Sequence, residues 1–267
     1  MTTTRGLRAR DEPITMLTAY DALTARIIDD CGVDIILVGD SMGTTVLGYD
    51  DTLPVTLAEA KSRTAAVARG TEDALVVADM PFLSVGVDES ESVRNAGEML
   101  KEADADAVKL ESGPHTVELT ERLTQLGIPV MAHLGLTPQH VNQLGGYTRQ
   151  GTTTKAAEEI LALARDHETA GAFALVLEHV PANVASQVTD ALDIPTIGIG
   201  AGPDCDGQVL VGTDIMGLSA DVPPFAEQFG DVRAAMTEAV DAYTSAVESG
   251  AFPGSEHSHI EDDVDLE

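Results

Sequence analysis

The sequence predicts a single-domain α/β protein that folds as a closed (β/α)8 barrel. Short apolar runs are each followed directly by charged, polar or glycine residues, and segments of helical pattern lie between them. Runs this short and this rich in Val, Ile and Leu are typical of parallel strands that are covered on both faces. The length of 267 residues agrees with one barrel of about 250 residues better than with two average domains.

The predicted strands recur along the whole chain in alternation with the helical segments. In order, they are Ile14–Thr18, Ile35–Val38, Leu75–Ala78, Ala107–Leu110, Val130–His133, Leu175–Leu177, Thr196–Ile199 and Asp214–Leu218. Eight strands that alternate with helices favour a closed barrel over an open doubly wound sheet. The pattern is weakest for the last of these strands.

Several helical segments begin with a recognisable capping signal. Thr56 and Asp88 each precede a helical run and are followed three residues later by a glutamate, which is the pattern of a capping box. Residues 231–250 carry apolar side chains at helical spacing and predict a long amphipathic helix. We expect the barrel domain to cover residues 1–254, and the acidic residues 255–267 to form a disordered tail.

The strong excess of acidic residues excludes some classes of function. The chain has 45 Asp and Glu against 15 Lys and Arg, for a formal net charge of -30, and this charge repels nucleic acid and anionic membranes. The acids are dispersed and lysine is scarce, which is typical of proteins from a cytoplasm of molar salt. There, salt screens self-repulsion beyond about 3 Å, against about 10 Å at 0.1 M. An ordinary acidic protein is the alternative.

The cysteines and the hydropathy predict a cytoplasmic protein. Cys31 and Cys205 form neither a disulfide framework nor a CxxC pair, so a reducing compartment is favoured. No apolar run approaches the length of about 18 residues that a membrane span requires. Residues 1–13 contain arginines but no apolar segment follows them, so they do not have the pattern of a signal peptide.

Two aspartates follow predicted strands at the point where each strand ends. Asp40 and Asp79 each come directly after an apolar run, and the carboxyl ends of parallel strands meet at one mouth of a barrel. Two carboxylates at this mouth could bind one cation, and ligation by oxygen alone favours Mg²⁺ or a similar hard ion over Zn²⁺. Taken singly, either aspartate is also a common helix cap or loop residue.

Four other ionisable residues lie at or near the ends of predicted strands. Lys109 and Glu111 are two residues apart and therefore point to the same face of a strand. They either belong to the site or form a structural ion pair inside the barrel. His133 and Glu178 stand where proton-handling groups are found, although a histidine there is often a core residue. In one cavity, four carboxylates and one lysine would leave a charge of -3. Such crowding favours a divalent cation and raises the proton affinity of one carboxylate, for which we expect Glu178.

Two glycine-containing segments have less specific patterns. Residues 198–202 are suited to cradling a phosphate, but they lack the acid that follows in dinucleotide sites, and glycine is common in tight turns. Residues 145–147 lie between the fifth predicted strand and the next helix, where either a mobile lid or an ordinary loop is possible.

Seven segments of the chain together carry the pattern of a known family. They are Thr18–Asp21, Leu37–Gly43, Asp51–Thr56, Ala78–Phe82, His133–Gln139, Leu144–Tyr147 and Ile197–Gly202. In this order and combination, the chain resembles the ketopantoate hydroxymethyltransferase family of pantothenate and coenzyme A biosynthesis. The resemblance covers most of the chain, and its motifs are highly specific in combination. The chain departs from the family in a shortened N-terminus, in its surface acids and in its acidic tail.

The resemblance implies a barrel enzyme that transfers a hydroxymethyl group from 5,10-methylenetetrahydrofolate to 3-methyl-2-oxobutanoate, which gives 2-dehydropantoate. It also implies a homo-oligomer, since members of the family form large rings, which include decamers. Carried over by position, the implied roles are Mg²⁺ ligation by Asp40 and Asp79 with Glu111 in the outer sphere, binding of the oxo acid by Asp40, Ser41, Asp79, Lys109 and His133, and general base catalysis by Glu178. The finer role of His133 is left open.

Two other functions compete with this interpretation. The first is a metal-dependent barrel lyase or mutase of the isocitrate lyase or phosphoenolpyruvate mutase type, which shares enolate chemistry with the family. Such enzymes usually carry a reactive cysteine motif in a loop, and neither Cys31 nor Cys205 lies in that setting. The second is a non-catalytic acidic barrel that only binds a ligand.

Overall fold

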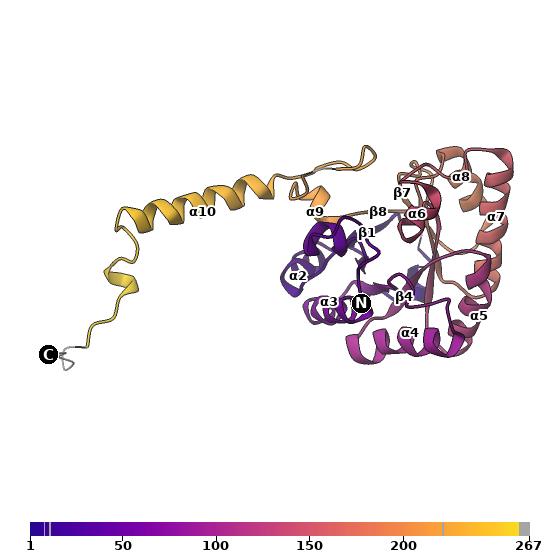
Figure 1. Ribbon diagram of the computed structural model, residues 1–267, viewed down its shortest axis with the longest axis horizontal. Helices are drawn as coiled ribbons and strands as arrows, with labels where there is room; N and C mark the ends of the chain where they lie inside the picture. The colour runs from indigo at the N-terminus through magenta and orange to yellow at the C-terminus, as the bar shows by residue number, and fades with distance from the viewer. Residues whose placement is uncertain (8, 11, 221, 262–267) are drawn as a thin grey trace. The chain divides into compact units, whose positions relative to one another are not determined.

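Eight parallel strands close into a barrel in the strand order β1 to β8, which confirms the predicted (β/α)8 barrel (Figure 1). This computed structural model describes residues 1–7, 9–10, 12–220 and 222–261. The barrel belongs to a unit of residues 1–212 and 223–226, and residues 213–222 and 227–267 form a second unit. The expected domain boundary at residue 254 stays a prediction, and residues 262–267 of the predicted tail lie outside the described residues.

The strands are short and most of their residues are buried. They are β1 (Ile14–Thr18), β2 (Ile35–Val38), β3 (Leu75–Asp79), β4 (Ala107–Glu111), β5 (Val130–Gly135), β6 (Ala174–Glu178), β7 (Thr196–Ile199) and β8 (Gly207–Leu210). Pairing of Met16 with Val209 joins β1 to β8 and closes the barrel. Seven of the strands lie where the apolar runs predict them, with ends that differ by two residues or fewer.

The predicted eighth strand is wrong. The strand is Gly207–Leu210, whereas Asp214 lies in the short helix α9 (Gly212–Ile215). The prediction assumed a helix between every pair of strands, but only residues 200–206 join β7 to β8, so the last strand begins earlier. The glycines at 198–202 allow close approaches in this connection, since a Cβ at Gly202 would lie 2.4 Å from the Ala182 side chain.

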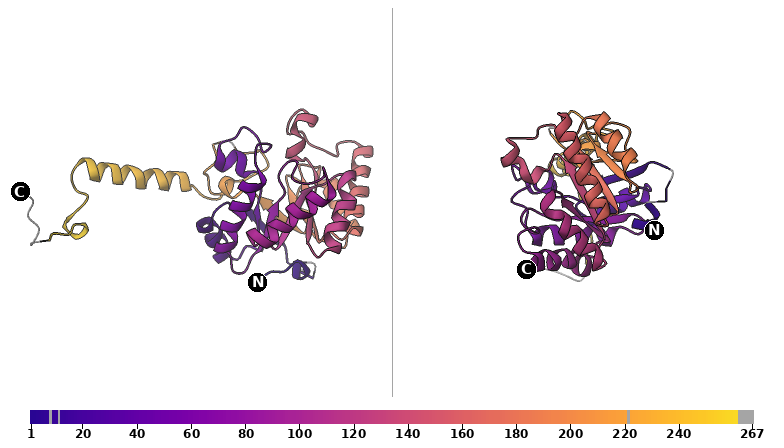
Figure 2. Two further views of the ribbon diagram at one scale, coloured as in Figure 1. Left: turned by 60° about the horizontal axis from the view of Figure 1, so that its bottom comes forward. Right: turned by 90° about the vertical axis from the view of Figure 1, so that its right-hand side faces the viewer.

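Helices form an outer layer around the barrel (Figure 2). The helices of the barrel unit, of which α1 lies at the N-terminal end of the barrel, are α1 (Thr4–Leu7), α2 (Ala22–Asp30), α3 (Leu57–Gly70), α4 (Glu89–Ala103), α5 (Val117–Gln125), α6 (Val141–Leu144), α7 (Thr154–Thr169) and α8 (Ala182–Ala191). Both predicted caps are confirmed, because Thr56 forms a reciprocal capping box with Glu59, and Asp88 accepts a 2.9 Å hydrogen bond from the backbone of Glu91. Among the described residues, no helix is long and apolar enough to cross a membrane.

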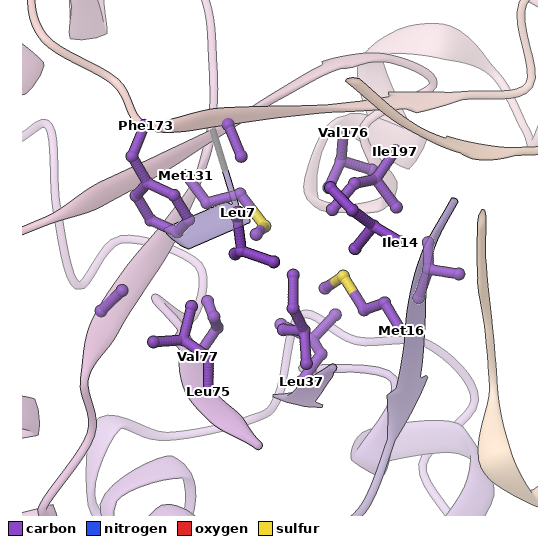
Figure 3. Packing of buried hydrophobic residues seen from close by; sticks show 14 residues of the cluster. Leu7, Ile14, Met16, Leu37, Leu75, Val77, Met131, Phe173, Val176 and Ile197 are labelled. Carbon is purple, nitrogen blue, oxygen red and sulfur yellow. The ribbon is translucent and has the colours of Figure 1, made fainter. Parts of the chain in front are cut away.

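The N-terminal end of the barrel is filled by an apolar core (Figure 3). Leu7, which is 2% exposed, packs with residues near the beginnings of the strands, such as Ile14, Leu75 and Phe173. The segment that carries Leu7 is held by a hydrogen bond from the backbone of Thr2 to the carbonyl of Asp73. The barrel interior is therefore closed by aliphatic side chains at this end, and its polar groups lie at the opposite end.

The second unit contains the predicted amphipathic helix, α10 (Val232–Glu248). Asp231 caps its N-terminus by accepting a hydrogen bond from the backbone of Ala234 at 2.9 Å. No residue of α10 is buried in the described part of the chain. Its apolar side chains are between 38% and 61% exposed and follow one another at helical spacing: Val232, Met236, Val240, Tyr243 and Val247.

Candidate active site

The polar site is a continuation of the apolar barrel core along the same strands. Val77, Ala107, Met131 and Val176 belong to the core. Two residues further along each strand, the inward positions carry ionisable groups, because side chains alternate between the two faces. The predicted site residues all line one cavity of about 110 Å³, and they are Asp40, Ser41, Asp79, Lys109, Glu111, His133 and Glu178. A larger groove of about 400 Å³ lies between α7 and α8, and of the described residues that line it, Glu158 alone is ionisable.

Asp40 and Asp79 are neighbours at the ends of β2 and β3. Asp40 is 6% exposed and Asp79 is 3% exposed, and the backbone N–H of Asp40 donates to Asp79 Oδ2 at 3.3 Å. Burial, and then the negative charge of Asp79, raise the pKa of Asp40 well above its usual value. Two carboxylates that repel each other in a buried site favour a proton or a cation between them.

Lys109 supplies positive charge to this cavity. Its Nζ lies 2.9 Å from Asp79 Oδ1, although Oδ1 has no hydrogen bond of good geometry. Burial acts to lower the pKa of Lys109, but the charges of Asp79, Asp40 and Glu111 outweigh burial and raise it. Lys109 is therefore a buried ammonium group that compensates part of the negative charge.

Glu111 is held by the loop that follows β5. Both of its carboxylate oxygens accept the backbone N–H of Gln139, at 3.0 and 3.1 Å. His140 Nδ1 lies 3.3 Å from Glu111 Oε2, and this hydrogen bond raises the pKa of His140. The side chain of Gln139 also contacts Asp40, and this contact was not predicted from the sequence.

Ser41 ends a chain of hydroxyl groups that begins at Thr18, which also lines the cavity. The backbone N–H of Gly212 donates to Thr18 Oγ1 at 3.0 Å, and Thr18 Oγ1 donates to the Tyr20 hydroxyl at 2.8 Å. The Tyr20 hydroxyl lies 2.9 Å from Ser41 Oγ. Because Tyr20 already accepts from Thr18, its own proton is available for Ser41, and the proton of Ser41 is then free for a ligand in the cavity.

Glu178 faces His133 on the neighbouring strand. His133 Nε2 lies 3.1 Å from Glu178 Oε2, at an angle that does not make a hydrogen bond. His133 Nδ1 lies 3.2 Å from Lys109 Nζ, and burial and the charge of Lys109 lower the pKa of His133 to about 3. His133 is therefore neutral. Since Lys109 is a donor, Nδ1 accepts and Nε2 carries the proton towards Glu178.

The environment of Glu178 suits a general base. Burial raises its pKa to about 7, against the lowering effects of Lys109 and His179. Its backbone is fixed by Gly135, which has φ +98, and a Cβ at Gly135 would lie 2.2 Å from the carbonyl oxygen of Glu178. The backbone N–H of Leu136 donates to the same oxygen at 2.8 Å. A carboxylate with a pKa near neutrality can both take and return a proton at physiological pH.

The residues in the cavity fit a hard divalent cation. Among the described residues there is no group of three or more His, Cys, Asp or Glu arranged to hold a metal ion. Mg²⁺, however, is commonly bound by one or two carboxylates and completes its octahedron with water and substrate oxygens. Asp40 and Asp79 supply this all-oxygen donor set, and their mutual repulsion would be relieved by a cation.

Comparison with known proteins agrees with the sequence motifs. The family described as ketopantoate hydroxymethyltransferase matches residues 1–255. The 3-methyl-2-oxobutanoate hydroxymethyltransferase of Haloarcula marismortui is 72% identical over 267 residues, which cover 99% of both chains. That of Halobacterium salinarum is 73% identical over 95% of this chain and 93% of its own. That of Geotalea daltonii is 50% identical over 92% of this chain and 93% of its own.

The solved structures that resemble this chain share its fold at low sequence identity. A 2,3-dimethylmalate lyase of the PEP mutase/isocitrate lyase superfamily matches with a TM-score of 0.62 at 19% identity, and the match covers 97% of this chain and 92% of the lyase chain. Phosphonopyruvate hydrolase matches with a TM-score of 0.60 at 13% identity, and the match covers 98% of this chain and 92% of the hydrolase chain. At these identities, the similarities concern the fold alone. The haloarchaeal origin of the first two relatives agrees with the predicted adaptation to high salt. The family match and these relatives together show that the chain belongs to the ketopantoate hydroxymethyltransferase family.

Proposed function

We propose that this protein transfers a hydroxymethyl group from 5,10-methylenetetrahydrofolate to 3-methyl-2-oxobutanoate and thereby forms 2-dehydropantoate, a step of pantothenate and coenzyme A biosynthesis. Membership of the family and the names of its relatives support this reaction. The observation that carries the proposal is the carboxylate of Glu178, whose pKa burial raises to about 7, in one cavity with the buried cation Lys109.

We propose Mg²⁺ as the metal, with Asp40 and Asp79 as ligands and Glu111 in the outer sphere. The two aspartates line the same cavity and provide the oxygen ligands that this ion prefers. When bound, Mg²⁺ would supply a Lewis acid for the keto oxygen of the substrate. The ionised form of Asp40 that ligation requires is disfavoured by burial and by Asp79, so binding of the cation should release protons at low pH.

The chain's own residues provide binding and proton transfer. Lys109 and Ser41 are suited to hold the carboxylate of the oxo acid, one by charge and the other as a hydroxyl donor. Glu178 removes the proton from carbon 3, while neutral His133 keeps its Nε2–H beside the base. Carbon 3 then forms a bond to the methylene carbon of the folate. Both bonds from that carbon to the folate nitrogens N5 and N10 break, and water supplies the new hydroxyl group. The two nitrogens take up the proton removed from carbon 3 and one proton from the water.

The lyase or mutase alternative has less support. The related structures of that superfamily are 13% to 19% identical to this chain, which is informative about the fold alone. A reactive cysteine in a loop at the site is the feature expected of those enzymes, and neither Cys31 nor Cys205 is among the residues that line the cavity.

The proposed function is tested by proton exchange at carbon 3. The wild-type protein is incubated with 3-methyl-2-oxobutanoate in D₂O and molar salt, with and without Mg²⁺ and folate, and deuterium incorporation is followed by NMR. We expect Mg²⁺-dependent exchange, which Glu178→Gln should slow by about 10² to 10⁴. The matched control, Glu158→Gln on the exposed face of α7, should exchange at the wild-type rate.

Two results would contradict the proposal. Absence of Mg²⁺-dependent exchange in the wild-type protein would exclude the enolisation step. Heat of binding in calorimetry, without any exchange, would favour the non-catalytic binding barrel. Exchange that persists in Glu178→Gln would keep the reaction but exclude Glu178 as the base.

We also propose that the protein is a homo-oligomer in which a second copy covers α10. The five apolar side chains that form one stripe on this helix are between 38% and 61% exposed, and burial of such a stripe is a common source of subunit association. Met236→Glu should reduce the mass measured by light scattering in molar salt. Thr237→Glu, one residue away on the same helix, is the control. A monomeric wild-type protein would exclude the proposal.

A further inference from the structure

Gln139 contacts two of the three carboxylates proposed to serve the metal. It lies in the 3-10 turn η3 (Pro138–His140), directly after β5. Its backbone N–H donates to both oxygens of Glu111, at 3.0 and 3.1 Å. Its side-chain amide nitrogen donates to Asp40 Oδ2 at 2.9 Å and to the carbonyl oxygen of Met80 at 3.0 Å. One residue therefore joins the ends of four strands.

The orientation of the Gln139 amide follows from its partners. A carboxylate oxygen and a backbone carbonyl oxygen only accept hydrogen bonds, so the nitrogen end of the amide must face both of them. Both amide hydrogens are then used, one on Asp40 and one on Met80. Oδ2 of Asp40 is thereby engaged, and its Oδ1 accepts no hydrogen bond from the described residues.

We propose that Gln139 is the positioning residue of the cation site, because it fixes the Asp40 carboxylate so that Oδ1 is left for the metal. This inference rests on the proposed function, since it concerns the same cation. Asp40 and Asp79 repel each other at close range. The amide of Gln139 holds Asp40 in place against that repulsion by a hydrogen bond to the charged oxygen. Contacts of this kind around metal ligands set both the orientation of the ligand and the affinity of the site.

The hydrogen bond between Gln139 and Asp40 can form only in the folded barrel, because it joins distant parts of the sequence. Gln139 and Asp40 are 99 residues apart in the sequence, and the loop after β5 must cross the mouth of the barrel to bring them together. The second contact, to the carbonyl oxygen of Met80, ties the residue that follows Asp79 to the same amide. Rotation of the Asp40 carboxylate would therefore break a hydrogen bond of Gln139, and the bond to Met80 fixes the amide relative to the end of β3, which carries Asp79.

The test is the affinity of the protein for Mn²⁺ alone, measured by electron paramagnetic resonance of the free ion in molar salt. Gln139→Met has nearly the same length but no amide, and it retains the backbone N–H that Glu111 accepts. We expect it to bind Mn²⁺ about 10- to 100-fold more weakly than the wild-type protein. Gln139→Asn keeps an amide that is one methylene too short to span Asp40 and Met80, and we expect it to weaken binding as well.

Gln143→Met is the matched control, since Gln143 is exposed on α6, four residues from Gln139. It should bind Mn²⁺ as the wild-type protein does. Circular dichroism and urea unfolding establish that each variant is folded, and if Gln139→Met does not fold, Gln139→Asn decides the question. A purely structural role would lower the unfolding midpoint and leave the Mn²⁺ affinity of the folded protein unchanged.

The outcomes separate this inference from the proposed function. Unchanged Mn²⁺ affinity in the folded Gln139 variants, with a wild-type protein that binds Mn²⁺, would overturn the positioning role and leave the proposed function intact. A wild-type protein that binds no Mn²⁺ would overturn the proposed metal site and the role of Gln139 together. Weaker binding in both Gln139 variants, with an unchanged Gln143→Met control, would support the inference.

Discussion

The substitution Glu178→Gln should make the folded protein more stable at pH 8 while it removes the proposed base. Glu178 is a largely buried carboxyl group, with its side chain 17% exposed, in a cavity with other carboxylates, and burial raises its pKa from 4.5 to about 7. Glutamine has nearly the shape of the protonated side chain and carries no charge. It therefore retains the packing of Glu178 and avoids the free energy of burying an ionised carboxylate.

The size of the effect follows from the difference between the folded and unfolded pKa values. The unfolded chain loses the proton of Glu178 near pH 4.5, whereas the folded chain keeps it until about pH 7. The stability that this proton contributes is complete below about pH 4.5 and is lost as the pH rises through about 7. At about 1.4 kcal/mol for each pKa unit, the loss amounts to about 3 kcal/mol at pH 8 and about 1 kcal/mol at pH 5.

The measurement is urea unfolding of the wild-type protein and of Glu178→Gln, in molar salt with a chelator, at pH 5 and pH 8. We expect the variant to have the higher free energy of unfolding, by about 3 kcal/mol at pH 8 and by about 1 kcal/mol at pH 5. Glu158→Gln, at an exposed position on α7, should show no such change with pH. Equal stabilities of Glu178→Gln and the wild-type protein at pH 8 would refute the argument that burial raises the pKa of Glu178.

Three other predictions follow from the same cavity and from the charge of the chain. The rate of exchange at carbon 3 should fall by up to about tenfold for each pH unit below 7, because Glu178 must be ionised to act; a flat profile from pH 5 to 8 would exclude it. Lys109→Met should destabilise the metal-free protein by about 3 to 5 kcal/mol, since it leaves Asp79 buried without its cation; urea unfolding measures this loss, and a value below 1 kcal/mol would contradict it. Removal of salt should abolish the compact state because the net charge is -30, and circular dichroism that is unchanged at low salt would argue against this.

The barrel and most of the candidate site could be predicted because several strands carry two signals in one short segment: an apolar run that predicts the strand, and an ionisable residue at its end that predicts the site. In β3 and β6, an apolar run that forms the core ends in a carboxylate, Asp79 or Glu178, at the mouth. The alternation of side chains along a strand then fixes which residues share the interior. In β4, Lys109 and Glu111 follow Ala107 at this spacing, and all three point inward.

The eighth strand could not be predicted in the same way. Gly207–Leu210 has four residues, of which Gln208 is exposed and Gly207 has no side chain, so neither alternation nor an apolar run marks it. Its pairing with β1 is a property of barrel closure, which depends on all the other strands. The more apolar segment Asp214–Leu218 therefore gave the stronger local signal.

The positioning contacts are also invisible to periodicity. Gln139 and Tyr20 both lie in motifs that support the family resemblance, but a motif does not say which atoms meet. Gln139 reaches Asp40 across the mouth, and Tyr20 reaches Ser41 from the next strand. Such contacts join loops that are far apart in the sequence, so they follow from the closed barrel and not from any local pattern.

The division of the barrel into two ends explains how one fold tolerates a cavity that opposes its own stability. At the mouth, Asp40, Asp79, Glu111 and Glu178 face Lys109, with His133 kept neutral because its pKa lies at about 3. The repulsion among these carboxylates disfavours the folded state until a proton or a cation is bound. At the other end, Leu7 and the first residues of the strands form a closed aliphatic core, and burial of this surface stabilises the fold by about 25 cal/mol for each Å². The strands connect the two ends, so the carboxylates have little freedom to move apart and relieve their repulsion, and the proposed affinity for a cation would then be a property of the folded barrel.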